Sequence, residues 1–327
     1  MLDDSPASPL SNSRSRRFMS IDSLWLLQVF FAALADLAFA SALGALLLRV
    51  WLGRERAFAS MSPARGGYRR ASRTSSVSAL VFIACIFASL WLQSAAMSGS
   101  PILDAGASLW LVATATHAGV GWAVACAGGV LLALASGTSG ALGAGRVAAA
   151  VLGAIVAAAG KAAVGHAADA GAFSIAEGVQ TLHLLATGVW GGVVIAGAAA
   201  VLPALDTSVA RASLVRIVSR MSHAAAIAVA LAIATGVFNA WRGTGGSADV
   251  LTGSGWGRAL LLKSALIACA LMLGALSRWS ALPRLQRTAS TTDAHTVINV
   301  MRVEAVLMVM VFVTASVLSH SVPGFAS

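Results

Sequence analysis

The chain consists largely of long apolar runs, each near the roughly 20 residues that an α-helix needs to cross a bilayer. The first extends from Leu24 to about Leu48. Seven more follow, at about 77–97, 107–135, 143–164, 174–201, 215–240, 257–279 and 297–319. Because lipid offers no hydrogen bonds to the backbone, such segments cross a membrane as helices. We therefore predict an all-α fold, a polytopic membrane bundle of about eight transmembrane helices.

The composition argues against a soluble protein of this length. Of the 327 residues, 58% are hydrophobic and only 10% are charged, which leaves too little polar surface for a soluble domain. The net charge of +10 could indicate nucleic-acid binding, but the arginines lie between apolar runs and not on one solvated basic face. We expect a lipid bilayer as the surroundings and no nucleic-acid partner.

The chain divides into three segments. Residues 1–20 are rich in Ser, Pro and Arg and are typical of a disordered polar tail. The run that follows is too long for the apolar core of a signal peptide, about 7–15 residues, so we interpret it as the first span. We predict an N-terminal four-helix membrane half at 21–164 and a C-terminal four-helix half at 165–327.

The distribution of positive charge predicts the orientation. Fifteen of the 22 Lys and Arg residues fall on one side of the expected spans, seven of them at 49–73. Loops rich in Lys and Arg stay in the cytoplasm, so both termini are expected outside it. The three arginines of the tail favour the reverse orientation, but they are outnumbered.

One stretch of the fifth run is unusually polar. At 3.6 residues per turn, Gln180, His183, Thr187 and Trp190 fall on or near one face, with Glu177 one turn above. Ionisable groups inside an apolar helix are costly and usually face the bundle interior, where they have a function. This stretch is therefore the first candidate for a functional site.

Two glycines lie directly below this face. Trp190 is too deep for the interfacial aromatic belt, and it is followed by Gly191 and Gly192. Small residues let helix backbones approach closely. We expect close helix packing here, which would narrow any path that leads down from His183.

Four histidines fall in the outer half of the expected bundle. His166 and His320 lie at outer helix ends, whereas His117 and His183 lie about 14–15 Å deep. Imidazole groups suit Cu, Zn or Fe, with Cu favoured by the affinity order of nitrogen ligands. A single buried histidine is as often a packing residue, and the argument for a metal site depends on the four occurring together.

Other polar groups could support such a site. Asp169 and Glu177 would add carboxylates near the outer surface. Thioethers for Cu(I) could come from Met97, Met272, Met308 and Met310, although packing is the commoner role of a methionine in an apolar helix. Glu304 could pair with Arg302 or Arg278, and we interpret it as one partner of a structural ion pair.

Several short motifs carry a resemblance to a known family. They are Gly165-His166, Leu182-His183-Leu-Leu-Ala-Thr-Gly-Val-Trp190-Gly-Gly192, Thr235-Gly236-Val-Phe-Asn239, Gly257-Arg258-Ala-Leu-Leu-Leu-Lys263 and Arg302-Val-Glu304. In order and spacing this series resembles the CopD/PcoD copper resistance membrane proteins over roughly 165–320. Two positions depart from the family pattern: Trp256 stands where Tyr is common, and Ser277 where Asn is common.

The resemblance implies an eight-helix inner-membrane protein of bacteria, associated with copper uptake or resistance. It also implies His166 and His183 as metal ligands, with Glu177 beside them. Such proteins often act with a small periplasmic copper-binding protein of the CopC type. This chain carries no fused domain of that kind, so any such partner would be a separate protein.

The leading hypothesis is copper transport across the inner membrane into the cytoplasm, as part of copper homeostasis. Copper would be received at His166 and His320 and passed to His183 and His117. Since binding needs neutral imidazoles, uptake should weaken as the pH falls towards the ordinary histidine pKa of about 6.5. The sequence lacks a Walker A motif, so ATP-driven pumping is not expected.

Two alternatives remain open from the sequence. The chain could bind b-type haem through His117 and His183 and act as an electron carrier or oxidoreductase. It could also be a copper sensor or a scaffold for a periplasmic partner, without transport. Only the haem alternative would make the protein an enzyme.

Overall fold

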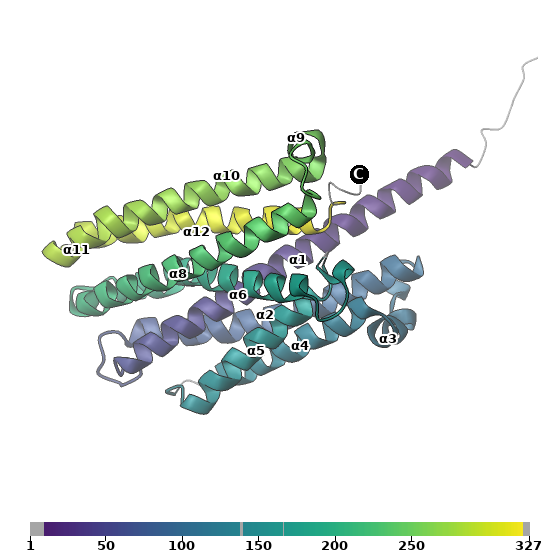
Figure 1. Ribbon diagram of the computed structural model, residues 1–327. Helices are drawn as coiled ribbons and strands as arrows, with labels where there is room; N and C mark the ends of the chain where they lie inside the picture. The colour runs from purple at the N-terminus through teal and green to yellow at the C-terminus, as the bar shows by residue number, and fades with distance from the viewer. Residues whose placement is uncertain (1–9, 138–139, 166, 323–327) are drawn as a thin grey trace, which may run out of the picture.

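The computed structural model describes residues 10–137, 140–165 and 167–322, with side chains from Ser23 onwards. Throughout this part the chain is helical and contains no strands, and eight helices are long and apolar enough to cross a membrane (Figure 1). The spans are Ser23–Arg54, Arg65–Ser98, His117–Ser136, Ala144–Ala162, Ile175–Leu205, Ser208–Gly243, Gly255–Thr288 and Thr291–Ser319. The prediction of an all-α polytopic bundle is confirmed.

Twelve α-helices make up these spans and their connections within the described residues. The long ones are α1 (Leu10–Arg54), α2 (Arg65–Ser98), α4 (His117–Ser136), α5 (Ala144–Ala162), α6 (Ile175–Ala196), α8 (Arg211–Gly243), α10 (Gly255–Leu276) and α12 (Thr291–Ser319). The short ones are α3 (Gly106–Ala115), α7 (Leu202–Leu205), α9 (Asp249–Gly253) and α11 (Leu282–Thr288). Helix α1 thus begins inside the segment 1–20 that the sequence predicts to be a tail.

Two spans change their helical winding towards the same end of the bundle. A π-helical turn at Gly197–Val201 joins α6 to α7, and another at Ser277–Ala281 joins α10 to α11. Pro203 and Pro283 follow these turns in the first residues of α7 and α11. Proline lacks the N–H that would bond one turn back, so the helix rewinds just before it.

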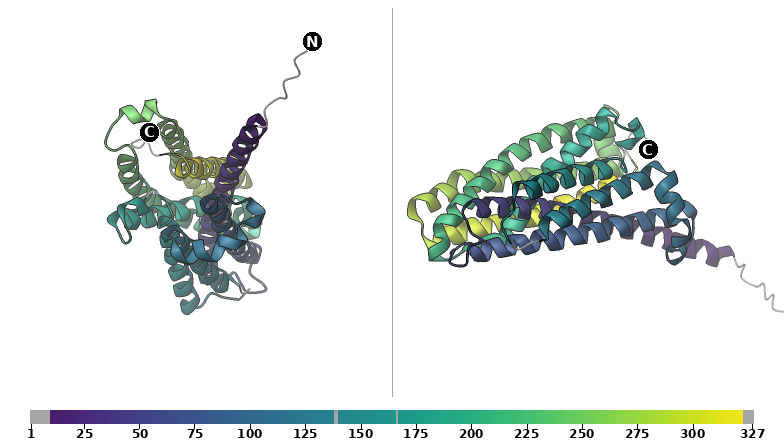
Figure 2. Two further views of the ribbon diagram at one scale, coloured as in Figure 1. Left: turned by 90° about the vertical axis from the view of Figure 1, so that its right-hand side faces the viewer. Right: turned by 90° about the horizontal axis from the view of Figure 1, so that it is seen from below.

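Helices α1 and α6 form the centre of the bundle. Helix α1 packs on α2, α6 and α12, whereas α6 packs on α1, α5, α8 and α12 (Figure 2). Helix α10 lies at the periphery and packs mainly on α12. Helix α12 ends at the same end of the bundle at which α1 begins, as an even number of spans requires (Figure 1).

The predicted third run, 107–135, is wrong as a single helix. Thr116 is extended (φ −117°, ψ 145°) and separates α3 from α4, and its hydroxyl accepts a hydrogen bond from the Gly119 N–H at 2.9 Å. Helix α3 folds back against α2, and in the turn just before α3 the Ile102 carbonyl accepts a hydrogen bond from Trp91 of α2 at 2.7 Å. His117 is consequently the first residue of α4, and not about ten residues into a span.

The close packing expected at Gly191 and Gly192 is present. A Cβ added to Gly192 would lie 1.9 Å from the Ala40 carbonyl oxygen, and one added to Gly44 would lie 1.9 Å from the Gly192 carbonyl carbon. A Cβ on Gly191 would lie 2.6 Å from the Phe312 ring. Helices α1 and α6 therefore touch backbone to backbone at this level.

At the opposite end of α1, a wholly buried arginine joins three parts of the chain. Arg49 donates to the carbonyl oxygens of Ser136 and Gly140 at 2.8 and 2.9 Å, and to the Tyr68 hydroxyl at 3.2 Å. Tyr68 in turn donates to the Gly140 carbonyl at 2.6 Å. Arg49 of α1 thus donates hydrogen bonds to carbonyl groups at and just after the end of α4, and Tyr68 of α2 belongs to the same network.

Replacing Arg49 by methionine should lower the free energy of unfolding by about 3 kcal/mol, because buried acceptors would lose a charged donor. The measurement is the melting temperature of the purified protein in detergent. Arg73→Met is the control, since Arg73 is an exposed arginine of α2. Equal melting temperatures for the two variants would contradict the assigned role of Arg49.

Candidate functional site

Glu177 is fixed in the first turn of α6 by the residues that start the helix. The Ser174 hydroxyl accepts a hydrogen bond from the Glu177 N–H at 3.2 Å, and Glu177 Oε2 accepts one from the Phe173 N–H at 2.7 Å. A serine followed three residues later by a glutamate is the pattern of a capping box. This cap holds the carboxylate at the end of the span.

The other oxygen of Glu177 faces His117. Glu177 Oε1 is buried, has no hydrogen-bond partner in the described chain, and lies 3.9 Å from His117 Nε2. That separation is too long for a hydrogen bond. Two ligands that each bind a metal ion at about 2.0–2.2 Å can lie this far apart. The imidazole is half exposed, so an ion could reach the pair from outside.

His183 lies deeper in α6 and faces α8 instead. Its Nδ1 is 2.9 Å from the hydroxyl oxygen of Thr235. Thr235 can donate its own hydroxyl hydrogen to the Leu231 carbonyl, 2.6 Å away, so we assign the imidazole as the donor in this contact.

This assignment leaves the second ring nitrogen of His183, Nε2, free to bind a metal. With the proton on Nδ1, a neutral ring carries its free electron pair on Nε2, and no described residue forms a hydrogen bond with Nε2. A histidine whose other N–H is held by a neighbouring acceptor is the usual arrangement of a metal ligand. Gly236 allows the close approach, since a Cβ there would lie 3.3 Å from His183 Cε1.

Two more residues of the predicted polar face lie against neighbouring helices, whereas the Thr187 hydroxyl donates to the His183 carbonyl of its own helix. Gln180 Oε1 accepts a hydrogen bond from Asn239 Nδ2 of α8 at 2.7 Å. The Trp190 indole, almost fully buried, lies beside Glu304 of α12. One face of α6 thus carries polar contacts to α8 and then to α12, over a rise of about 15 Å.

The other predicted ligands are more scattered. His166 lies outside the described residues, and Asp169 lies in a short turn, Ala168–Ala170, between α5 and α6. His320 follows the last residue of α12; its Nδ1 is 2.9 Å from the Ser316 carbonyl oxygen, and its own carbonyl accepts a bond from Trp25. Among the described residues, no three His, Cys, Asp or Glu side chains come together as a metal site.

His117 and His183 therefore do not share a depth. His117 pairs with Glu177 at the end of the span, and His183 is six residues further along α6, about 9 Å deeper. The haem alternative assumed that these two imidazoles lie level with each other. That assumption is wrong, because the helix break at Thr116 moves His117 to a helix end.

Sequence reasoning missed the partners of several intramembrane groups. Lys161 of α5 forms an ion pair with Asp36 of α1 at 2.5 Å. Thr235 and Asn239, one turn apart on α8, hold His183 and Gln180. The available signal was the presence of polar residues in separate apolar helices, which must find partners inside the bundle.

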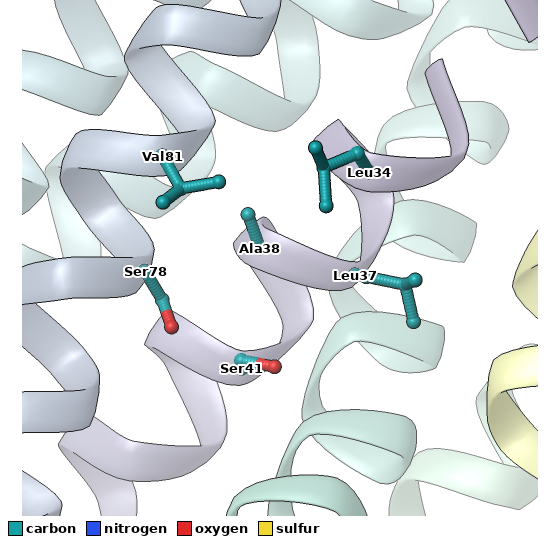
Figure 3. A pocket seen from close by; sticks show the side chains of 6 residues that line it. All are labelled: Leu34, Leu37, Ala38, Ser41, Ser78 and Val81. Carbon is teal, nitrogen blue, oxygen red and sulfur yellow. The ribbon is translucent and has the colours of Figure 1, made fainter. Parts of the chain in front are cut away.

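The hollow between α1 and α2 is not part of this site (Figure 3). It is lined by Leu34, Leu37, Ala38, Ser41, Ser78 and Val81. Two serine hydroxyls and four apolar side chains offer no imidazole, thiol or carboxylate. We assign no copper ligand there.

The fold and these contacts define a multi-pass α-helical membrane protein with imidazole and carboxylate side chains at and below one end of its spans. Two family models match the chain: copper resistance protein D at residues 215–318, and the copper resistance protein D-like N-terminal domain at residues 20–175. The chain belongs to the copper resistance protein D (CopD) family, and its role is in copper resistance and transport. No curated protein and no solved structure matched the chain.

The family resemblance drawn from the sequence is thereby confirmed. Of the motifs quoted for it, those at 235–304 lie within the first matched range and Gly165-His166 within the second, whereas the His183 motif lies between the two ranges. The second family model also covers the first four spans. In those spans the sequence offered only hydropathy and one histidine for comparison.

Proposed function

We propose that this protein carries copper across the bacterial inner membrane into the cytoplasm, with His183 as the ligand inside the membrane. The observation that carries the proposal is the hydrogen bond from His183 Nδ1 to Thr235, which leaves Nε2 to bind a metal. A neutral imidazole nitrogen is a ligand that suits copper. Family membership supports copper as the cargo.

Copper would first bind at the outer end of the spans. His117 Nε2 and Glu177 Oε1 are the pair that could take it from water, since one is half exposed and the other has no hydrogen-bond partner in the described chain. His166, His320 and Asp169 remain proposed ligands at the same surface. A separate periplasmic protein of the CopC type would supply the metal there.

From this pair copper would descend α6 to His183. The carboxylate of Glu177 would offset the charge of the cation as it leaves water. Placing an uncompensated charge inside the membrane is the main cost of moving an ion into a span. Gln180, held by Asn239, lies between the two positions and offers polar atoms along the way. The proposed ligands lie towards the end of the bundle at which α1 begins and α12 ends. Both termini are predicted to lie outside the cytoplasm, so this position favours capture from outside and movement inward.

Copper binding by the purified protein tests the proposal. Wild-type protein in detergent should bind copper in competition with a chromophoric chelator, and His183→Ala should lose one bound equivalent. His223→Ala is the matched control, because the Nδ1 of that histidine, on α8, lies 2.8 Å from a carbonyl oxygen of its own helix. Equal copper content in all three proteins would overturn the role of His183.

Thr235→Val should weaken copper binding without abolishing it. Valine keeps the shape of threonine but cannot accept the Nδ1–H, so the imidazole loses its fixed tautomer and orientation. Loss of such a supporting group costs about 10–100-fold in metal affinity. The chelator competition measures this change, and an affinity within twofold of wild type would contradict the assigned tautomer.

A further inference from the structure

Glu304 is a deeply buried carboxylate without a cationic partner. It lies in the middle of α12, roughly 20 Å from either end of the helix, and is 5% exposed. The predicted ion pair is wrong, since Arg302 bonds to Asn299 and Arg278 bonds to Ser222. In the described part of the chain, Glu304 forms no salt bridge.

The surroundings of Glu304 leave its charge uncompensated. The Trp190 indole of α6 lies beside the carboxylate. On the other side is Gly274 of α10, where even an added Cβ would lie 3.5 Å from Glu304 Oε1. A buried charge without a partner is strongly destabilising, and an intramembrane carboxylate of this kind indicates a site for a cation.

Two thioethers share the face of α12 that carries Glu304. Met301 and Met308 lie three residues before and four residues after it, the spacings that bring side chains together on a helix. Both are buried, with 5% and 1% exposure. The Met308 methyl group lies 3.0 Å from where a Cβ of Gly191 would be, so this face of α12 is turned towards α6.

We propose that Met301, Glu304 and Met308 form a second copper site, specific for Cu(I). Thioether sulfur is a soft ligand that selects Cu(I). One carboxylate neutralises one monovalent cation, which lowers the cost of holding the ion away from water. The glycines at 191 and 274 let α6 and α10 approach Met308 and Glu304 closely, since a Cβ at either position would lie 3.0–3.5 Å from those side chains.

This inference rests on the proposed function, because it supplies the next position on the same route. Trp190 is seven residues below His183 on α6, about 10 Å deeper. Copper leaving His183 Nε2 would therefore meet Glu304 and the two thioethers beside Trp190. The route would change from nitrogen ligands in the outer half to sulfur ligands at the centre.

X-ray absorption at the copper edge of the purified, Cu(I)-loaded protein tests this site. Wild-type protein should show both nitrogen and sulfur scattering from copper. The double variant Met301→Leu, Met308→Leu should lose the sulfur scattering and one bound equivalent. Met310→Leu is the control, because Met310 is an exposed methionine of the same helix. Leucine replaces methionine at small cost in packing, usually below about 1.5 kcal/mol.

A second variant separates charge from sulfur. Glu304→Gln keeps the shape of the side chain and should weaken Cu(I) binding at least tenfold, with a melting temperature close to wild type. Sulfur scattering that persists in the double variant, or is absent from wild type, would overturn the inference. His183→Ala distinguishes the two proposals, since it should lose one bound equivalent and part of the nitrogen scattering and keep the sulfur scattering. Nitrogen-bound copper alone would leave the proposed function standing, whereas a wild-type protein that binds no copper would refute both.

Discussion

Gly192→Ala should greatly lower the yield and the melting temperature of the folded protein, because α1 and α6 have no room for a methyl group where they cross. The added Cβ would lie 1.9 Å from the Ala40 carbonyl oxygen and 2.9 Å from the Gly44 N atom. Backbone atoms cannot rotate away as a side chain can. Overpacking a core usually costs about 1–3 kcal/mol, and here the two central helices must separate, so we expect a cost at or above that range.

The matched control for this variant is Gly178→Ala in the same helix. No atom lies within 4 Å of a Cβ added there, and alanine is favoured over glycine inside a helix by about 1 kcal/mol. Gly178→Ala should therefore match or slightly exceed the wild-type melting temperature. Size-exclusion yield and thermal melting in detergent measure both variants. A Gly192→Ala protein as stable as Gly178→Ala would show that the crossing of α1 and α6 is wrong.

Much of the fold could be predicted from the sequence because the bilayer leaves the chain few options. Runs of apolar residues in lipid must be helical, and Gly, Ser and Pro between them gave eight spans, as found. The start of α6 could also be foreseen, since Ser174 and Glu177 have the spacing of a capping box. The close packing at Gly192 followed from the absence of side chains there.

The depth of His117 could not be predicted, because apolar residues continue on both sides of Thr116. The break depends on α3 docking against α2, where Trp91 bonds to Ile102. Hydropathy does not record such a contact. A single long run and two shorter helices look the same on a scale that counts only apolar character.

Partners far apart in the sequence were likewise hidden. His183 and Thr235 are 52 residues apart, and Asp36 and Lys161 are 125 apart. Each lies in an apolar helix, and only the packing of the helices shows which polar group meets which. The sequence could mark His183 as a candidate ligand, but not which of its nitrogens is free.

Copper transport should depend on His183 more than on any other imidazole of the described chain. Its side chain is the proposed ligand between the outer pair and the centre of the bundle, so its loss would interrupt the route and not merely slow its first step. His183→Ala should reduce copper flux by about tenfold or more. Loss of a group that only supports a metal ligand already costs about 10–100-fold in affinity or activity. His223→Ala should leave the flux unchanged, since its ring bonds within α8.

Copper flux into sealed proteoliposomes that contain only this protein is the most direct test. The vesicles are loaded with a copper chelator, copper is added outside, and the metal inside is measured over time. We expect accumulation with wild type and with His223→Ala, and accumulation near that of protein-free vesicles with His183→Ala. Equal accumulation with His183→Ala and wild type, or none above protein-free vesicles with wild type, would contradict copper passage through His183.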